Sequence, residues 1–511
     1  MIRWIILMLF LMLCWNGAIA GAQVMAEFQD KRAKTPEVLA HVPLKAVVVE
    51  YLDPFDSGLG KSLSCLIWRE VLTAISDQAG AGVIVAETPP GERLVDLLKQ
   101  DYHIAAERIA RHQKARMVIW GVVSSDNDEL AIQTYLSLLT DDKQSGLKFG
   151  LGSKVIAGPS RWLEEQQHTR IEADLAYKRF NFDADLLLRN ALFDRTLVTS
   201  ARVDIKSRPD KNARTLRKLA ANKAIRAVDM TGAWFKVALP EGGFGYLNAG
   251  TFGKLRLPPR EVSGTSNRVN LRNGPGTDHA VVATRNLGRE PIRVLDMRYR
   301  KGHGLWYRID LGARDSWVAA WLVKPRFSLP VIDFVAGLYR YYGERHEQAI
   351  DAFSRYIDSS DPLTDNVNLA AAFQLRGASR ILANKTDSNG NTEGYRDFSR
   401  AIELTPYNPN AFLLRSVANL GMSQPKAALA DLDKALSLDR EYRPARKLAT
   451  TFKSIADKPG MSPLGIMTRL PQVKAEVDKL TTSHRIEQNV RPIPERSPAR
   501  LDNHQRGIER Y

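Results

Sequence analysis

The sequence predicts a multidomain protein with an α/β domain, two small all-β barrels, an all-α repeat region and a disordered C-terminal tail. Three patterns support this division. Buried strands alternate with helical patterns in the first part of the chain, and short strands separated by turn residues fill the middle. Helical periodicity returns after Pro330. A chain of 511 residues is long enough for several domains.

The first 20 residues have the features of a secretory signal peptide. Arg3 supplies a positive charge, an apolar run follows, and Ala18-Ile-Ala20 fits a cleavage site. The run is too short for a transmembrane helix, and a retained N-terminal anchor is the alternative. We therefore expect residues 1–20 to be removed, no transmembrane helix in the mature chain, and a periplasmic or cell-envelope location. Cys65 is then the single cysteine left, so no intrachain disulfide is expected.

Residues 44–199 are expected to form the α/β domain. Strand and helix patterns alternate in the order β-α-β-α-β-β up to about Thr140. This order, together with the block Ala115-Arg-Met-Val-Ile-Trp-Gly121, resembles the TolB amino-terminal-like domain, a relative of the envelope proteins FlgO and CsgG. The resemblance implies a non-catalytic domain that makes protein contacts in the periplasm. Trp162 to Phe193 has a mostly helical period, which predicts a helical extension of this domain.

The segment Gly58-Leu-Gly60-Lys61-Ser62 matches a phosphate-binding loop only in part. The first glycine of such a loop would stand where Phe55 is, and Asp53 and Asp56 would repel phosphate. We expect a turn at the two glycines, with Ser62 near the start of a helix.

Residues 263–326 are expected to form a small β barrel. Val269-Asn-Leu-Arg-Asn-Gly-Pro-Gly276 predicts a strand that ends in a turn, and Trp306-Tyr-Arg-Ile309 and Ser316-Trp-Val318 predict later strands. The order of these motifs resembles the bacterial SH3 (SH3b) domain, whose members often accompany cell-wall enzymes.

Four residues of this barrel are the candidate ligand-binding residues: Asn270, Arg272, Trp317 and Trp321. Polar tips and indole rings beside one groove suit sugar–peptide ligands. The alternative is that one or both tryptophans belong to the barrel core, which is the position we expect for Trp306.

Residues 200–258 repeat the same motif order in a degenerate form. Val203-Asp-Ile-Lys206 aligns with the first strand of the second barrel, and Trp234-Phe-Lys-Val237 aligns with its Trp-Tyr-Arg-Ile motif. The first copy lacks the turn glycines, so we expect its turn to be looser. The joint Pro258-Pro259 is expected to hold the two copies at a semi-rigid angle.

The chain carries a formal net charge of +16, and both predicted barrels are rich in lysine and arginine. A basic surface attracts acidic partners. Export argues against nucleic acid and leaves acidic peptidoglycan stems, anionic lipid head groups and lipopolysaccharide. A solvated surface without a ligand is the alternative.

Residues 330–456 are expected to form helix pairs with a capping helix. Gly337 and Phe353, then Gly377 and Phe398, recur with a spacing that resembles tetratricopeptide (TPR) repeats. The resemblance implies a concave groove for a protein or peptide partner, with a purely structural stack as the alternative. Residues 457–511 combine proline and charge with hardly any aromatic residues, which predicts disorder.

The sequence has no metal-binding spacing of histidine or cysteine and no nucleophile elbow. We therefore expect no enzyme activity, no cofactor and no metal. The hypothesis is a non-catalytic exported scaffold that binds the cell wall or another acidic envelope ligand through its barrels and a partner protein through its helices. A peptidoglycan hydrolase with its catalytic part in 141–199, and a structural assembly subunit without affinity for the wall, are the two alternatives.

Overall fold

The fold is described from a computed structural model. The residues that it describes are 45–75, 82–86, 102–113, 115–139, 147–151, 169–173, 179–182, 184–250, 255–265, 268–300, 302–312, 315–327, 329–343, 345–360, 366–383, 385, 393–422, 424–442, 445–446 and 449. The predicted signal peptide and the predicted disordered tail lie outside these residues. Helices and several largely antiparallel sheets together make a mixed α/β fold.

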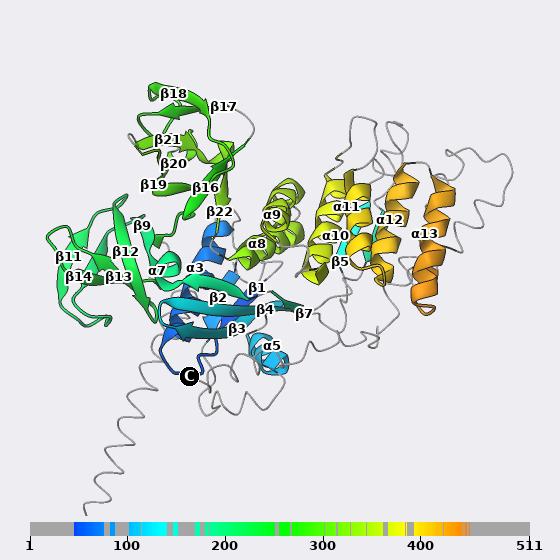
Figure 1. Ribbon diagram of the computed structural model, residues 1–511, viewed down its shortest axis with the longest axis horizontal. Helices are drawn as coiled ribbons and strands as arrows, with labels where there is room; N and C mark the ends of the chain where they lie inside the picture. Colours follow the sequence, from blue (N-terminus) through cyan, green and yellow to red (C-terminus); the bar gives the residue numbers. More distant parts are fainter. Residues whose placement is uncertain are drawn as a thin grey trace, which may run out of the picture.

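A six-stranded sheet lies at the centre of the molecule (Figure 1), in the order β2-β1-β3-β4-β7, with β8 also paired to β4. Its strands are β1 (Lys45–Val49), β2 (Gly82–Ala86), β3 (Met117–Asp126), β4 (Glu129–Leu138), β7 (Arg179–Asn181) and β8 (Asp185–Leu188). β1 is parallel to β2 and β3, and β4 is antiparallel to β3. Helix α3 (Leu59–Ala74) belongs to one apolar cluster and helix α5 (Tyr102–His112) to another. The order of these elements along the chain is the predicted β-α-β-α-β-β.

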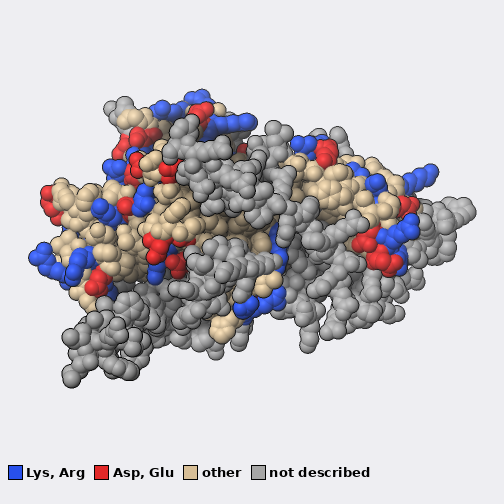
Figure 2. Space-filling model, turned by 60° about the horizontal axis from the view of Figure 1, so that its bottom comes forward, with Lys and Arg blue, Asp and Glu red and all other residues tan. Residues whose placement is uncertain are grey.

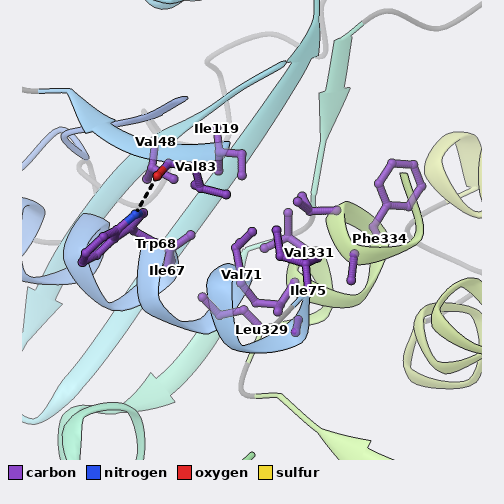
Figure 3. Packing of buried hydrophobic residues seen from close by; sticks show 14 of the residues in the cluster. Val48, Ile67, Trp68, Val71, Ile75, Val83, Ile119, Leu329, Val331 and Phe334 are labelled. Carbon is purple, nitrogen blue, oxygen red and sulfur yellow. Dashed lines mark hydrogen bonds between the residues drawn. The ribbon is translucent and has the colours of Figure 1, made fainter. Parts of the chain in front are cut away.

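Helix α3 is buried on nearly all sides because it lies between the sheet and helix α8 (Pro330–Tyr342). Figure 3 shows Trp68 beside the strands, where its Nε1 donates a hydrogen bond to the carbonyl oxygen of Val83 at 3.0 Å. Farther along α3, Val71 and Ile75 lie beside Leu329 and Val331. Each large apolar side chain buried in this way contributes about 1.5–3 kcal/mol.

The predicted helical extension is wrong in the parts that the structure describes. Within Trp162–Phe193 the described residues form β6 (Thr169–Ala173), which pairs with β5 (Leu147–Leu151), then β7 and β8, and the one described helix is the short α7 (Arg189–Phe193). β7 and β8 pair with β4, and Phe180 is buried between the more exposed Arg179 and Asn181. Pairing with the sheet edge therefore outweighs a weak helical period.

Two seven-stranded sheets follow, and their strand orders correspond one to one. The first unit has the order β11-β10-β14-β13-β12-β9-β15 and the second β18-β17-β21-β20-β19-β16-β22. The first β unit consists of β9 (Arg195–Thr199), β10 (Val203–Lys206), β11 (Thr215–Leu219), β12 (Ala224–Thr231), β13 (Trp234–Ala238), β14 (Phe244–Asn248) and β15 (Leu255–Arg256). The second β unit consists of β16 (Glu261–Gly264), β17 (Arg268–Arg272), β18 (Val281–Asn286), β19 (Ile292–Arg300), β20 (Gly304–Asp310), β21 (Asp315–Ala319), the 3₁₀ helix η2 (Ala320–Leu322) and β22 (Val323–Arg326).

The first β unit begins earlier than residue 200. β9 pairs with β12 and with β15, as β16 pairs with β19 and β22 in the second unit. The residues 195–199, which the sequence assigns to the α/β domain, are therefore hydrogen bonded into the first β unit.

The turn of the first copy, which the sequence predicts to be looser, closes with the same backbone hydrogen bond as its counterpart. The backbone N–H of Ser207 donates to the carbonyl of Arg214 at 2.9 Å, just as Asn273 donates to Ala280 at 3.1 Å in the second copy. The side chain of Asp210 accepts a further bond from the Asn212 N–H at 2.9 Å. This side chain closes a turn that lacks glycine.

Helices α8 to α13 form three pairs, which run from the middle of Figure 1 to its right side. Their bounds are α8 (Pro330–Tyr342), α9 (His346–Ser359), α10 (Asn366–Leu382), α11 (Glu393–Leu404), α12 (Pro409–Gly421) and α13 (Pro425–Leu438). A Cβ atom on Gly337 would lie 2.5 Å from the ring of Phe353, and one on Gly377 would lie 2.7 Å from the ring of Phe398. The small and aromatic positions of the repeat are therefore in direct contact.

One apolar core runs through three of these regions. It joins the face of the central sheet that α3 covers to the interior of the first β unit and to the helix pairs as far as α12, with residues such as Phe235 and Phe334 in the same cluster. The second β unit has its own core, which reaches the first unit through Val198.

Candidate functional site

The site predicted in the second β unit is built on one face of its sheet. Trp317 on β21 stands directly opposite Arg272 on β17 and directly opposite Arg308 on β20. Residues paired across strands point to the same face of a sheet. The structure therefore places an indole between two arginines, and it pairs the predicted residues Arg272 and Trp317.

Three tryptophans meet at this face. Trp306 pairs with Ala319 in the next register position and is 2% exposed, so its predicted burial is confirmed. Its Nε1 donates to the carbonyl of His303 at 2.7 Å, and its ring contacts Trp321 edge to face at 5.6 Å between centroids. Trp317 is 8% exposed and Trp321 is 59% exposed. Trp321 is therefore the indole that can meet a ligand without rearrangement.

Two arginines that the sequence does not single out complete the site. The guanidinium of Arg298 lies 5.5 Å from the Trp317 ring centroid, within the range of a cation–π interaction. Arg308 lies 3.8 Å from Asp315, and its buried Nε has no hydrogen-bond partner among the described residues. We call the six residues the tryptophan–arginine face: Arg272, Arg298, Trp306, Arg308, Trp317 and Trp321. Arg308 could have been found from its position two residues after Trp306, which places both on one side of a strand.

Asn270 makes a hydrogen bond to the other neighbouring strand. Its Oδ1 accepts a hydrogen bond from Thr284 Oγ1 on β18 at 2.6 Å. Arg272 donates from Nη1 to the carbonyl of His279 at 2.5 Å, which holds its guanidinium group at the turn. No contact joins Asn270 to the tryptophans among the residues described.

The turn beside this face is held by Arg300. Its guanidinium donates to both oxygens of Asp278, at 2.8 and 3.0 Å, and to the carbonyl of Pro275 at 3.0 Å. The bond from Arg300 is the main cause that lowers the pKa of Asp278. The turn therefore has a fixed position relative to the β19–β20 hairpin.

A second candidate surface is the face of the helix pairs formed by α10 and α12. Gln374 accepts a hydrogen bond from Asn410 at 3.0 Å, and Asn410 accepts one from Tyr442 at 2.9 Å. Strand β5 lies against α10 and strand β6 lies against α12 (Figure 1). The chain's own hairpin therefore contacts these helices.

The helix pairs share a repeated ion-pair arrangement. Arg376 donates to Asp397 at 2.7 and 3.0 Å, and Arg415 donates to Asp431 at 2.6 and 3.0 Å. Each arginine also lies over an aromatic ring, Phe373 in one pair and Phe412 in the next. Burial raises the pKa of Asp397 despite the arginine beside it. These pairs therefore fix the helices rather than present free charges.

The glycine motif before α3 holds a carboxylate of the chain itself. Gly58 has a φ of +79°, and Asp53 Oδ2 accepts hydrogen bonds from the backbone N–H groups of Leu59 at 2.9 Å and Gly60 at 3.4 Å. A phosphate would compete with this carboxylate for the same donors. The predicted turn and the helix start near Ser62 are confirmed.

The described part of the chain has no group of three or more His, Cys, Asp or Glu side chains that could hold a metal ion. It also contains no helix that is both long and apolar enough to cross a membrane. Cys65 is buried in α3, as expected of a core residue.

No protein-family model matches the chain. No curated protein matches it either. Solved structures similar to part of it include TPR domains. The first TPR domain of Spaghetti (RPAP3), bound to an HSP90 peptide, is 15% identical and covers 25% of this chain and 94% of its own, with a TM-score of 0.22. The Arabidopsis OM64 TPR domain is 19% identical, with coverages of 24% and 94% and a TM-score of 0.21. MamA from Desulfovibrio magneticus RS-1 is 15% identical, with coverages of 30% and 78% and a TM-score of 0.22. With scores this low, the inferences below rest on the geometry of the chain itself.

Proposed function

We propose that this protein is a non-catalytic scaffold of the bacterial cell envelope. Its second β unit binds an acidic envelope ligand, with peptidoglycan as the first candidate, and its TPR-like helix pairs bind a partner protein. The two β units are taken as SH3b-like barrels, and the central sheet as a TolB-like domain that adds a further protein contact.

The tryptophan–arginine face carries this proposal. Trp321 exposes more than half of its surface and contacts Trp306, and the exposed Arg298 lies over the neighbouring Trp317 ring. An exposed indole beside cations suits a ligand that has both apolar ring faces and carboxylates, as the sugar–peptide units of peptidoglycan have.

Co-sedimentation of the mature chain with purified peptidoglycan tests the proposal. Binding through arginines is partly electrostatic, and exposed charges are screened beyond about 8 Å at physiological salt. We therefore expect binding at low salt that weakens clearly as salt is raised. A protein that stays in the supernatant at low salt removes peptidoglycan as the ligand.

Two tryptophan variants separate the ligand surface from the core. Trp321→Ala should weaken binding by about 2 kcal/mol, the size of an interface hot spot, and leave the melting temperature nearly unchanged because its ring is exposed. Trp317→Ala should instead destabilise the second β unit by about 3–5 kcal/mol, as is usual for a buried tryptophan. Circular dichroism and co-sedimentation measure the two effects. Full binding by a folded Trp321→Ala variant contradicts the proposed surface.

Arg272→Glu tests the electrostatic part, with Arg289→Glu as its matched control. Arg272 pairs with Trp317, whereas Arg289 is exposed in the connection before β19. The first substitution should weaken binding about tenfold or more, because it places a carboxylate opposite an acidic ligand. The second makes the same change in net charge and should have a small effect. Equal losses in both variants indicate non-specific attraction by the whole basic surface.

The mature chain and purified peptidoglycan also test the two alternatives, a hydrolase and a structural assembly subunit. A clearing band in a zymogram on purified wall supports a hydrolase. A chain that neither clears nor binds the wall but forms a defined oligomer in size-exclusion chromatography supports a structural assembly subunit. An affinity pull-down from envelope extract with the mature chain identifies the protein that binds the helix pairs.

A further inference from the structure

We infer that the first β unit carries a second binding face, equivalent in register to the tryptophan–arginine face and selective for the same acidic sugar–peptide chemistry. This inference rests on the proposed function. It would make the chain bivalent for a polymeric wall.

The strand register supports the equivalence. Tyr246 on β14 stands opposite Lys206 on β10 and opposite Lys236 on β13. An aromatic ring is again flanked by two cations, as Trp317 is in the second unit. Trp234 pairs with Asn248 in the next register position, where the second unit has Trp306 and Ala319. We call these four residues, with Phe244, the tyrosine–lysine face: Lys206, Trp234, Lys236, Phe244 and Tyr246.

The two faces differ at the cross-strand pair that follows Tyr246 or Trp317 on the side away from Trp234 or Trp306. The second unit has Asp310 opposite Asp315 there, whereas the first unit has Ala238 opposite Phe244. Phe244 is 51% exposed, and Lys236 Nζ lies 4.4 Å from its ring centroid. The first face therefore lacks two carboxylates that would repel an anion, and in their place it offers an exposed ring.

The surroundings of this face are also basic. Arg208, Lys211, Arg214 and Lys218 are exposed on or beside the β10–β11 hairpin. β11 and β14 lie at the left end of Figure 1, and lysine and arginine atoms are visible at the same end in Figure 2. A basic rim raises the local concentration of an anionic ligand.

The chemistry selects an anionic glycan or glycopeptide rather than a simple anion. Tyr246 and Trp234 are half-buried and Phe244 is exposed, so ring faces are available for stacking. Lysine ammonium groups pair with carboxylates as point charges and do not demand a planar partner. A ligand with both features gains from ring and cation together, whereas inorganic phosphate meets the cations alone.

Isothermal titration of the full mature chain with a soluble disaccharide–peptide from peptidoglycan tests the inference. The wild type should take up two equivalents per chain. Lys236→Glu and Arg272→Glu should each leave one, and the double variant should leave none. Phe244→Ala removes an exposed ring, so it should fold normally and weaken the first site. Lys223→Glu, in the connection between β11 and β12, makes the same charge change away from the face and should keep two equivalents.

Binding to intact peptidoglycan provides the second measurement. Two linked sites on a polymer bind more tightly than either alone. Either single substitution should therefore weaken binding to intact wall by about tenfold or more beyond its effect on the soluble fragment. One equivalent for the wild type, with no change in Lys236→Glu or Phe244→Ala, overturns the second face and leaves the proposed function standing. A wild type that takes up no fragment overturns both.

Discussion

The two β units have the same strand order but are joined to the rest of the molecule in different ways. The interior of the first unit is part of the core that also holds α3, the central sheet and the first helix pairs. The interior of the second unit is a separate cluster that touches the first unit through Val198. One repeat is therefore built into the body of the protein, and the other is held on it.

Polar contacts follow the same division. Ser62 on α3 accepts a hydrogen bond from the N–H of Gly232 in the first unit at 2.9 Å, and Arg69 reaches the carbonyl of Leu255. Arg195 on β9 pairs with Glu70 on α3, and both side chains are fully buried. The second unit contacts the helices by an exposed pair, Lys324 and Asp358, at 4.0 Å. A duplicated unit can thus share the central core of the molecule in one copy and keep a core of its own in the other.

The largest test of this difference uses the aligned core residues Phe235 and Tyr307, which are both buried. Replacement of either by alanine should cost about 3–5 kcal/mol. Phe235→Ala should raise hydrogen exchange in the first unit, in α3 and in α8 together, because they share one core. Tyr307→Ala should raise hydrogen exchange in β16 to β22. Hydrogen-exchange mass spectrometry measures both, and a Phe235→Ala effect confined to β9–β15 contradicts the shared core.

The next test compares a buried and an exposed ion pair of the first unit. Arg195→Met leaves the Glu70 carboxylate buried without its partner and should cost about 3–5 kcal/mol. Arg226→Met removes a pair with Asp194 in which the arginine is 61% exposed, and should cost less than about 1 kcal/mol. Urea denaturation of both variants gives the comparison. Similar losses of unfolding free energy in the two variants would show that burial of the Arg195–Glu70 pair adds nothing to stability.

The pH dependence of Arg195→Met gives a related but smaller effect. Burial raises the pKa of Glu70 above its ordinary value of 4.5, although Arg195 lowers it. Without Arg195 the pKa should rise further, so the folded state binds a proton that the unfolded state releases. The free energy of unfolding should therefore increase as the pH falls from neutral toward the pKa that Glu70 has in the unfolded chain. Glu70→Gln in the same background should remove this slope.

The smallest effect is expected at the start of α3. Burial alone would raise the pKa of Asp53, but the hydrogen bonds from Ser57, Leu59 and Gly60 outweigh it and lower the pKa. The ionised Asp53 carboxylate therefore stabilises the fold at pH values above its pKa in the unfolded chain. This stabilisation is lost as the pH falls through the lowered pKa of the folded state. Asp53→Asn removes a negative charge at the start of α3 and should cost about 0.3–1 kcal/mol near neutral pH. Asp56→Asn, an exposed neighbour, should change stability little, and neither variant should affect exchange in the second unit.

Local patterns predict much of this architecture. The β-α-β-α-β-β order, the two related β units and the contacts of Gly337 and Gly377 with phenylalanine rings all follow from periodicity and spacing. At the site, the pairing of Arg272 with Trp317 and the burial of Trp306 agree with the predicted barrel face and core.

The parts that fail depend on contacts between distant segments. β7 and β8 are strands because they find the edge of β4, and β9 belongs to the first unit because β12 pairs with it. Arg298 joins the site through a cross-strand hairpin and a ring contact that spacing does not reveal. The fusion of three regions into one core likewise depends on which faces meet, and each face by itself has an ordinary amphipathic pattern.

The position of α3 also determines when the protein can complete its folding during synthesis. Arg340 donates to the carbonyl of Ala74 at 2.7 Å, so the last turn of α3 is covered by a helix that the ribosome makes 266 residues later. Contacts of such long range slow folding and leave apolar surface open in the meantime. A fragment cut after β4 would have every strand and helix of the α/β pattern, but the side of α3 that α8 covers would be exposed to water. Such fragments should aggregate, and the shortest soluble one should extend past Tyr342.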